Sequence, residues 1–241
     1  MSAVTQAVVL VGGRGTRLGE LTLTIPKPMM PIRGRPFLEY LVEILISSGF
    51  NQVLFCTSYL AGHIQRHFGK GKRFGITADY SHETHPLGTG GALWLARGKL
   101  DNQFLVVNGD TIFDIPLRQV TGLLARHPAA LAAMALRHVP DTGRYGSVQE
   151  EGEFVTEFGE KKGDGPGLIN GGVYCLTRKA VDLLPAGESS LERNLFPRLV
   201  ANRQLCAAAF DGYFLDIGLP DTLERAEREL PKIRVREEHR K

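Results

Sequence analysis

Residues 12 to 27 combine glycines and cations in a pattern suited to binding phosphate. Gly12, Gly13 and Gly15 fall within four positions, and Arg17 follows two residues later. Glycines let a turn bring backbone N–H groups close to an anion without interference from a Cβ atom. Arg17 adds a guanidinium that can grip two phosphate oxygens, and Lys27 adds a compact positive charge. This set of donors and cations predicts a polyphosphate-binding site.

The two best-known phosphate-binding loops do not fit these residues. A Walker A loop needs a lysine directly after its last glycine, and none follows here. The dinucleotide fingerprint G-x-G-x-x-G/A is broken by Leu18, and the apolar segment 53–56 lacks an acidic residue at its end to hold a ribose. A nicotinamide-dependent oxidoreductase is therefore disfavoured. On the glycines alone, an ordinary surface turn remains an alternative.

Alternating apolar segments predict the elements that position this loop. Residues 7–11 form a short, β-branched segment typical of a strand buried on both faces of a parallel sheet. Strands and helices alternate up to residue 138, which implies right-handed crossovers and a mainly parallel sheet. We expect helices over 36–48, 61–68, 93–98, 117–126, 191–199 and 219–230, and strands over 7–11, 53–56, 76–81, 104–107, 130–138, 144–148, 155–161, 168–176 and 214–218.

Composition indicates one large α/β domain over residues 1–241. The chain is 43% hydrophobic and 23% charged, with a net charge of +3 that is too small to favour nucleic acid as a partner. Its cysteines, Cys56, Cys175 and Cys206, form no C-x-x-C pair and are expected to be buried thiols in a reducing compartment. The sequence has neither an 18-residue apolar segment nor the charged start of a signal peptide. We therefore expect a cytoplasmic protein with no membrane partner.

Two aspartates lie where apolar segments end or where burial is costly. Asp110 follows the predicted strand 104–107, at the edge where open α/β sheets bind ligands, although a helix N-cap or turn is the alternative. Asp216 lies within an apolar segment, and a carboxylate there is costly unless it is paired or binds a metal. Asp114 is a weaker candidate because it lies further into the turn.

The motif G-G-x-G-T-R-L at 12–18, followed by P-K-P at 26–28, resembles the signature of the sugar-phosphate nucleotidyltransferases. These enzymes join a sugar 1-phosphate to a nucleoside triphosphate. The resemblance extends from residue 7 to about residue 229 and implies a Rossmann-like three-layer α/β/α fold with a mainly parallel mixed sheet. It also implies that Arg17 stabilises the departing phosphates and that Lys27 contacts phosphate at the reacting end. Asp110 and Asp216 would be the ligands of a catalytic Mg²⁺.

The resemblance implies a nucleotide-binding half over about residues 1–140. Its nucleotide-binding residues would be Leu10, Gly12, Gly13, Gly15, Thr16, Glu83, Gly88 and Thr89. Glu83 falls on a base-contacting position, where a carboxylate can accept hydrogen bonds from the amino edge of guanine. This favours GTP, although relatives that transfer uridylyl groups can carry a glutamate nearby.

A sugar-binding half is implied over about residues 141–230. Its sugar-phosphate-binding residues would be Tyr145, Gly146, Glu160, Lys161 and Asn170, joined by Asn108 from the first half. Glu160 and Lys161 correspond to the family's E-K pair, with glutamate on sugar hydroxyls and lysine on the sugar phosphate. Without the other motifs, this pair would be interpreted as a surface ion pair.

Within the family, the motifs are most similar to those of bacterial enzymes that guanylylate D-glycero-D-manno-heptose 1-phosphate for surface or capsule polysaccharide. The resemblance thus implies a cytoplasmic guanylyltransferase that uses GTP, a sugar 1-phosphate and Mg²⁺. Mannose 1-phosphate guanylyltransfer and uridylyltransfer are alternatives on the same fold, as is a non-catalytic nucleotide-sugar sensor. A homo-oligomer, most simply a dimer, is also expected.

Overall fold

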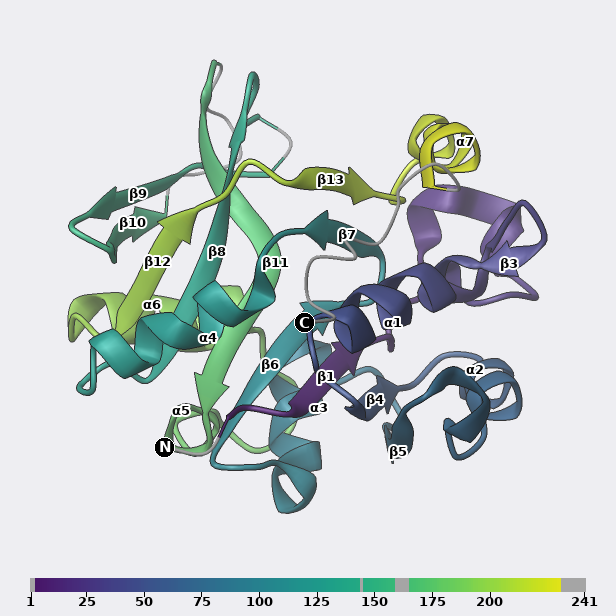
Figure 1. Ribbon diagram of the computed structural model, residues 1–241, viewed down its shortest axis with the longest axis horizontal. Coiled ribbons are helices and arrows are strands. Elements are labelled where there is room, and N and C mark those ends of the chain that lie inside the picture. The colour runs from purple at the N-terminus through teal and green to yellow at the C-terminus, as the bar shows by residue number, and fades with distance from the viewer. Residues whose placement is uncertain (1–2, 144, 159–164, 231–241) are drawn as a thin grey trace.

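A single nine-stranded sheet organises the chain in the computed structural model, which describes residues 3–143, 145–158 and 165–230. The strand order is β5-β4-β1-β6-β11-β8-β12-β10-β9 (Figure 1). These strands are β1 (Gln6–Leu10), β4 (Gln52–Thr57), β5 (Thr77–His82), β6 (Gln103–Asn108), β8 (Ala132–Val139), β9 (Val148–Glu151), β10 (Phe154–Phe158), β11 (Gly167–Thr177) and β12 (Leu205–Ala209).

The first four strands in this order, the parallel group, pair only in parallel with one another. Strand β1 is paired with β4 on one side and β6 on the other, and β4 is paired with β5. The chain runs outward from β1 to β4 and β5, then returns to β6 on the opposite side of β1. This reversal creates the topological switch point at which open α/β sheets bind ligands.

The other five strands, the mixed group, are mostly antiparallel. Strand β11 runs antiparallel to β6 and β8, whereas β12 is parallel to β8. A two-residue turn at Gly152 (φ 54°) and Glu153 (φ 64°) joins β9 to β10 as a hairpin, because positive φ at both positions matches the twist of antiparallel strands. Strand β9 also pairs with β11 through Leu168 and Val148, which closes this group into a ring. The prediction of a mainly parallel sheet is therefore correct only for the parallel group.

Helices cover both faces of the sheet. Alternate residues of the buried strands point to opposite faces, so Val9 belongs to one apolar core and Val8 to the other. One core takes side chains from α1 (Phe37–Ser47), α2 (Ala61–Phe68), α4 (Leu117–Arg126) and α7 (Pro220–Glu229). The other takes them from α3 (Gly88–Ala96), α5 (Arg178–Val181) and α6 (Phe196–Ala201). The expected α/β class is confirmed.

Several elements differ from the sequence-based expectation. Helix α3 begins at Gly88 and includes Gly90 and Gly91. The sequence predicts that these glycines interrupt regular structure and that the helix begins only at residue 93. Strand β12 was not predicted, and neither was β7 (Thr111–Asp114), which pairs with β13 (Tyr213–Asp216) in a separate two-stranded sheet. The predicted helix 191–199 is divided into a π-helical turn, Leu191–Leu195, and α6. A small hairpin, β2 (Pro31–Ile32) and β3 (Arg35–Pro36), precedes α1.

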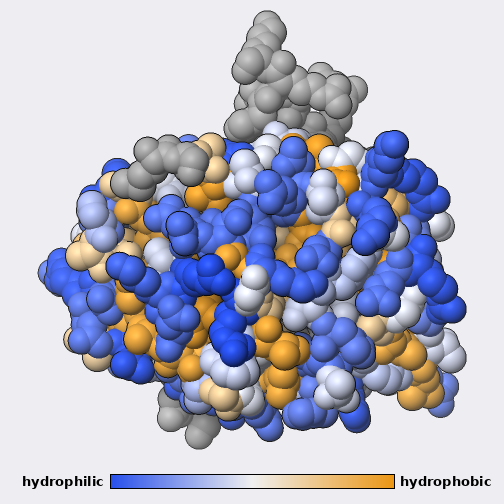
Figure 2. Space-filling model, turned by 90° about the horizontal axis from the view of Figure 1, so that it is seen from below, coloured by the Kyte–Doolittle hydropathy of each residue, from blue (hydrophilic) through white to orange (hydrophobic). Residues whose placement is uncertain are grey.

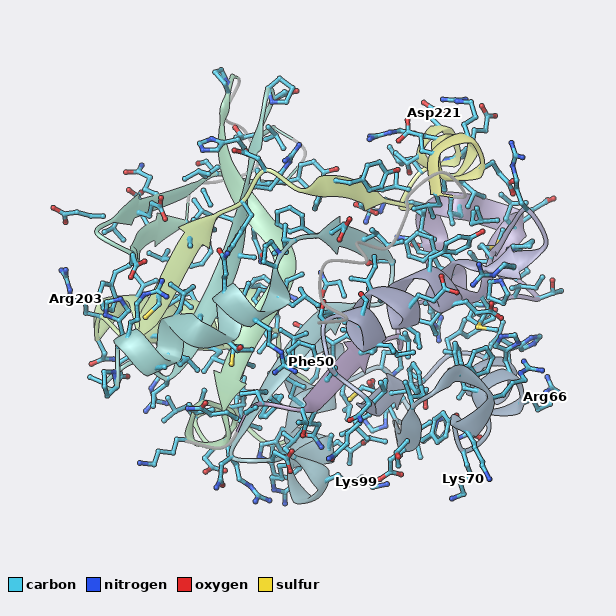
Figure 3. All side chains as sticks on the ribbon, viewed as in Figure 1. Phe50, Arg66, Lys70, Lys99, Arg203 and Asp221 are labelled. Atoms are coloured by element: carbon cyan, nitrogen blue, oxygen red, sulfur yellow. The ribbon has the colours of Figure 1, made fainter. Side chains whose placement is uncertain are left out.

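The surface is mostly polar. Figure 2 shows hydrophilic side chains interspersed with small hydrophobic patches on the face seen from below. Figure 3 shows Arg66, Lys70, Lys99, Arg203 and Asp221 at the periphery, whereas Phe50 lies toward the middle. Phe50 is fully buried, with the Arg118 guanidinium 4.2 Å from its ring centre. No helix within the described ranges combines the length and apolarity needed to cross a bilayer.

Candidate active site

A pocket of about 440 Å³ opens at the carboxyl ends of the parallel strands. Leu10 and Asn108, the last residues of the adjacent strands β1 and β6, are register partners and both line it. The predicted nucleotide-binding residues in its wall are Leu10, Gly12, Gly13, Gly15, Thr16, Glu83, Gly88 and Thr89. Arg17, Lys27 and Asp110 also line it. One pocket therefore collects residues from segments that are up to 100 positions apart in the sequence.

The glycine loop is packed closely onto the segment that carries Lys27. Gly15 adopts φ 66°, and a Cβ atom there would lie 3.0 Å from Cβ of Lys27 and 3.1 Å from Cγ2 of Thr22. The Thr22 hydroxyl donates to the Gly15 carbonyl at 3.3 Å, which fixes the loop where a 3₁₀ helix begins. Glycine is needed at this position for both its left-handed conformation and the close approach. Arg17 is exposed just beyond the turn and faces the pocket.

Lys27 and Asp110, which line the pocket, form a charged cluster with Asp216. Nζ of Lys27 lies 2.6 Å from Oδ2 of Asp110 and 3.5 Å from Oδ1 of Asp216. The lysine side chain is only 6% exposed, whereas that of Asp110 is 36% exposed. A buried ammonium needs such partners, because removing an unpaired charge from water is costly. The exposed side of Asp110 faces the pocket that the glycine loop encloses.

The small sheet of β7 and β13 brings the two aspartates together. Asp216, at the end of β13, is the register partner of Thr111, which directly follows Asp110. The backbone N–H of Ile217 donates to the Asp110 carbonyl at 3.1 Å, and Gly218 N–H donates to Oδ1 of Asp216 at 2.6 Å. Antiparallel pairing thus places a carboxylate from near the C-terminus beside one from the middle of the chain. The sequence suggested both residues, but the β7 strand that joins them was missed.

The two carboxylates suit a magnesium ion. Mg²⁺ in phosphate-handling sites is held by one or two carboxylates and completes its octahedral shell with waters and substrate phosphates. Asp110 and Asp216 supply two such ligands beside the expected polyphosphate site. No group of three or more His, Cys, Asp or Glu side chains within the described ranges could hold a metal alone. The donor set therefore fits a cation that arrives with a phosphorylated substrate.

Glu83 lies on the opposite wall, behind the glycine loop. Its side chain is nearly buried, and Oε2 accepts from the Leu87 N–H at 2.8 Å. Oε1 points toward Gly12, where an added Cβ would lie 3.1 Å from that oxygen. Burial raises the pKa of Glu83, although the Leu87 hydrogen bond and the nearby histidines oppose this effect. One carboxylate oxygen is thus fixed by the backbone, and the other is directed toward the pocket.

The N-terminus of α3 is closed by a segment from the other half of the chain. The Ser189 carbonyl accepts from the N–H groups of Gly90 and Gly91 at 2.9 and 3.2 Å. These donors would otherwise be free to attract an anion, as the first N–H groups of a helix usually are. The Thr89 hydroxyl accepts from Leu191 N–H and donates to Glu192. The capped terminus therefore offers an anion fewer free N–H donors at this end of the pocket.

The predicted sugar residues are only partly brought to the pocket. Asn108 lines it, and Asn170 is linked to Asn108 through the side chain of Tyr174. The Tyr145 ring meets Phe214 at a centroid distance of 6.1 Å, two residues before Asp216. Gly146 is buried next to Tyr145, with φ 83°. Glu160 and Lys161 lie outside the described residues.

Several lining residues were not predicted. Arg14, Pro28, Cys56, Pro86, Ala92 and Gly218 complete the wall with Val11. Arg14 lies inside the glycine motif and is exposed. Its position in the motif could have identified it as a pocket residue. Cys56 ends a parallel strand beside Leu10, and that register appears only once β1 and β4 are paired.

Comparisons with known proteins accord with this geometry. Residues 6–233 match the family described as nucleotidyl transferase. The chain is 38% identical over 217 residues to the D-glycero-alpha-D-manno-heptose 1-phosphate guanylyltransferase of Campylobacter jejuni, covering 90% of this chain and 96% of that one. It is also 38% identical to the mannose-1-phosphate guanylyltransferase of Mycobacterium tuberculosis, covering 93% of this chain but 64% of that longer protein.

The solved structure of HddC from Yersinia pseudotuberculosis superposes with a TM-score of 0.82 at 32% identity, covering 94% of this chain and 99% of that one. The same protein has been solved in complex with GMP-PN, with the same score and coverage. The likeness therefore extends over nearly the whole described chain, including both groups of strands.

Proposed function

This chain belongs to the nucleotidyl transferase family, and on that premise we propose that it transfers GMP from GTP to D-glycero-D-manno-heptose 1-phosphate. The products are a GDP-sugar and pyrophosphate. The observation that carries the proposal is the pocket that the glycine loop, Arg17, Lys27 and Asp110 line together, with Asp216 paired to Lys27 beside it. Such a site binds a polyphosphate and a metal together.

The reaction needs charge neutralisation more than proton transfer. A sugar 1-phosphate has a second pKa near ~6, so it is mostly a dianion at neutral pH and can attack the α-phosphorus without a general base. The obstacle is repulsion between two anions. Arg17, exposed at the pocket wall, is placed to hold the departing pyrophosphate, and Lys27 to hold phosphate at the reacting end.

Asp110 and Asp216 are the residues that would hold the magnesium ion. A bound Mg²⁺ would supply positive charge that stabilises the negative charge developing on the phosphates during transfer. Lys27 pairs with both carboxylates in this structure. A bound triphosphate would attract the Lys27 ammonium, and the aspartate oxygens could hold a cation only after Lys27 releases them. We propose that Lys27 then shifts its hydrogen bonds from the aspartates to phosphate.

Glu83 supports guanine as the base. An ionised carboxylate accepts hydrogen bonds only, which suits the N1–H and N2–H₂ edge of guanine and opposes the N1 acceptor of adenine. The backbone donor of Leu87 holds the carboxylate in place, and the capped terminus of α3 leaves a neutral surface beside it.

The heptose phosphate is proposed because two heptose 1-phosphate guanylyltransferases are 38% and 36% identical to this chain. Mannose phosphate is the alternative, because a mannose-1-phosphate guanylyltransferase is also 38% identical. The product would serve surface or capsule polysaccharide synthesis. The three cysteines are all unpaired and buried, which supports the expected cytoplasmic location.

The test is pyrophosphate release with Mg²⁺, using GTP, ATP, UTP, CTP and dTTP against heptose, mannose, glucose and N-acetylglucosamine 1-phosphates. We expect release with GTP and the heptose phosphate. Release with mannose phosphate instead would retain the reaction and change the sugar. Release with UTP or dTTP would contradict the role given to Glu83, and silence throughout would favour a non-catalytic sensor.

A further inference from the structure

Tyr174 buries its ring in the core while its hydroxyl reaches the active-site side of the sheet. It lies in β11 and is 1% exposed, with its ring centre 5.1 Å from that of Phe196. A buried phenol usually serves the core through its ring and must satisfy its hydroxyl within the protein. The partners of that hydroxyl therefore show what else the residue does.

One partner is an asparagine of the proposed sugar-phosphate side, and a second asparagine lies nearby. Nδ2 of Asn170 donates to the Tyr174 hydroxyl at 2.8 Å. The Asn108 side chain lies near this hydroxyl and acts to lower its pKa. Asn108 lines the pocket two residues before Asp110, whereas Asn170 lies in β11 at the other end of the bulge from Tyr174. The Tyr174 hydroxyl thus lies beside amides from two different strands.

The backbone between the two asparagines makes this junction rigid. The register of β11 against β8 is broken between Asn170 and Tyr174, as in a β-bulge. Within the bulge, Gly172 has φ 73°, and an added Cβ would lie 2.8 Å from Nδ2 of Asn108. The Gly172 N–H in turn donates to Oδ1 of Asn170 at 2.9 Å. The missing side chain of Gly172 lets the Asn108 amide approach β11.

These bonds fix how the Asn170 amide is turned. The oxygen of Asn170 accepts from Gly172 and one of its N–H groups donates to Tyr174, so the second N–H is the donor that remains for a ligand. Because the Gly172 N–H can only donate, the amide cannot be reversed without losing that bond. Burial raises the pKa of Tyr174 well above its ordinary value, so the hydroxyl stays neutral.

We propose that Tyr174 is a positioning residue that holds Asn108 and Asn170 in the orientation that binds the sugar phosphate. This inference rests on the proposed function, because it assigns Asn108 and Asn170 to the sugar side of that same site. Held in one orientation, the amides bind substrate without first losing rotational freedom. Removing the hydroxyl takes away the acceptor that holds one Asn170 N–H and loosens this junction, while leaving the ring and the nucleotide pocket in place.

The test is Tyr174→Phe, measured as binding rather than turnover. Isothermal titration compares the dissociation constants of GDP-D-glycero-D-manno-heptose and of GDP. We expect the preference for the GDP-sugar over GDP to fall by about tenfold in the variant, with GDP affinity unchanged, which is the size of effect when one or two hydrogen bonds are lost. In steady-state kinetics, KM for the sugar phosphate should rise while KM for GTP does not.

The matched control is Tyr40→Phe, which removes a hydroxyl bonded to the Ile32 carbonyl away from the pocket. It should leave both affinities unchanged. In a double-mutant cycle, Asn170→Ala with Tyr174→Phe should lose less than the sum of the two single losses, because the hydroxyl acts through that amide.

Equal loss of GDP and GDP-sugar affinity in Tyr174→Phe would show a general structural role and overturn the proposal, as would an unchanged preference. If the wild-type protein itself does not prefer the GDP-sugar to GDP, the proposed function fails instead, and the two failures are thereby distinguished.

Discussion

The parallel group and the mixed group build their parts of the site in different ways. In the parallel group, many site residues lie at or just after the carboxyl end of a strand, as Gly12 does after β1 and Asp110 does after β6. In the mixed group, Asn170 and Tyr174 stand inside one strand and are brought into use by a break in its register. The first arrangement is local in sequence, and the second depends on pairing between distant strands.

This difference suggests which residues would select each of the two proposed substrates. A triphosphate is recognised by a loop and a few cations, which any parallel strand end can present. A sugar presents hydroxyls that require fixed donors and acceptors, and we propose that the mixed group supplies them through the hydrogen-bonded junction at Tyr174. We therefore expect mutations in the parallel group to alter the use of GTP and mutations in the mixed group to alter the use of the sugar phosphate.

Asp110 stands between the two groups, and its loss should have the largest effect. Asp110→Ala removes one proposed magnesium ligand and the 2.6 Å partner of Lys27, so we expect turnover to fall by about 10³-fold or more while the protein still folds. Pyrophosphate release and thermal unfolding measure the two outcomes. Asp101→Ala, an exposed position before β6, is the control and should be silent. A variant that stays active and Mg²⁺-dependent would contradict the two-aspartate assignment.

A matched pair of glycine substitutions tests whether the parallel group affects the use of GTP and the mixed group the use of the sugar phosphate. An added Cβ would lie 2.3 Å from Val11 Cγ1 at Gly109, and 2.6 Å from the Phe113 ring at Gly171. Each change forces neighbouring atoms apart and should destabilise the protein by about 1–3 kcal/mol. We expect Gly109→Ala to raise KM chiefly for GTP and Gly171→Ala to raise it chiefly for the sugar phosphate.

The control for this pair is Gly122→Ala in α4, where space is open and alanine should stabilise the helix by about 0.5–1 kcal/mol. Steady-state kinetics with each substrate varied in turn, together with denaturant unfolding, give the readouts. If both variants raise both KM values equally, the two groups do not act separately.

Much of the parallel group could be predicted from the sequence because its signals are local. The glycine loop, the apolar strand before it and the turn at Asp110 are each read from adjacent residues. Helix α3 was missed at its start because Gly88, Gly90 and Gly91 are poor helix formers. Glycine fits there because Ser189 lies where side chains at Gly88 and Gly90 would stand, and the Gly187 carbonyl lies where one at Gly91 would stand.

The mixed group was predicted less well because its elements depend on partners. Strand β12 reads LCAAA, a segment with little β propensity, and it forms because β8 and β10 flank it. The junction at Tyr174 could not be foreseen either. The sequence places Asn108 and Tyr174 66 positions apart, and only the antiparallel pairing of β11 with β6 brings them together.

Glu83→Gln tests whether a residue of the parallel group affects only the nucleotide. It should change the preference among nucleotide bases without changing binding of the sugar phosphate. A glutamine presents one donor and one acceptor, which opposes guanine and suits adenine. We expect kcat/KM for GTP to fall by about tenfold and the preference over ATP to shrink, with KM for the sugar phosphate unchanged. An unchanged ranking of the nucleotides would exclude Glu83 from base selection.

The same variant has a predicted pH signature. Burial raises the pKa of Glu83, so the wild-type carboxylate takes up a proton at a higher pH than an exposed glutamate does. GTP affinity should therefore begin to fall above the ordinary pKa of 4.5 as the solution is acidified, and Glu83→Gln should abolish this dependence. Keeping a raised-pKa carboxylate ionised costs stability at neutral pH, so the variant should not unfold at a lower temperature.

The smallest expected effect lies at the tip of the mixed group, in the turn between β9 and β10. Oε1 of Glu153 lies 2.7 Å from the Arg126 guanidinium and Oε2 lies 2.8 Å from His127 Nε2. The hydrogen bonds from Arg126 and His127 lower the pKa of Glu153 to about 2. A lowered pKa contributes stability that is present above the ordinary value of 4.5 and is lost as the pH falls toward 2.

Glu153→Gln should therefore lower the melting temperature slightly at neutral pH and have no effect near pH 2. The carboxylate is exposed and screened by solvent, so we expect a difference of about 2 °C or less. Differential scanning fluorimetry from pH 7 to pH 2 measures it, with both KM values expected to match the wild type. A change in KM for the sugar phosphate would instead mean that the β9–β10 hairpin transmits to the site through the pairing of Val148 with Leu168. In that case, residues that influence sugar-phosphate binding would extend to β9, the last strand in the order of the sheet.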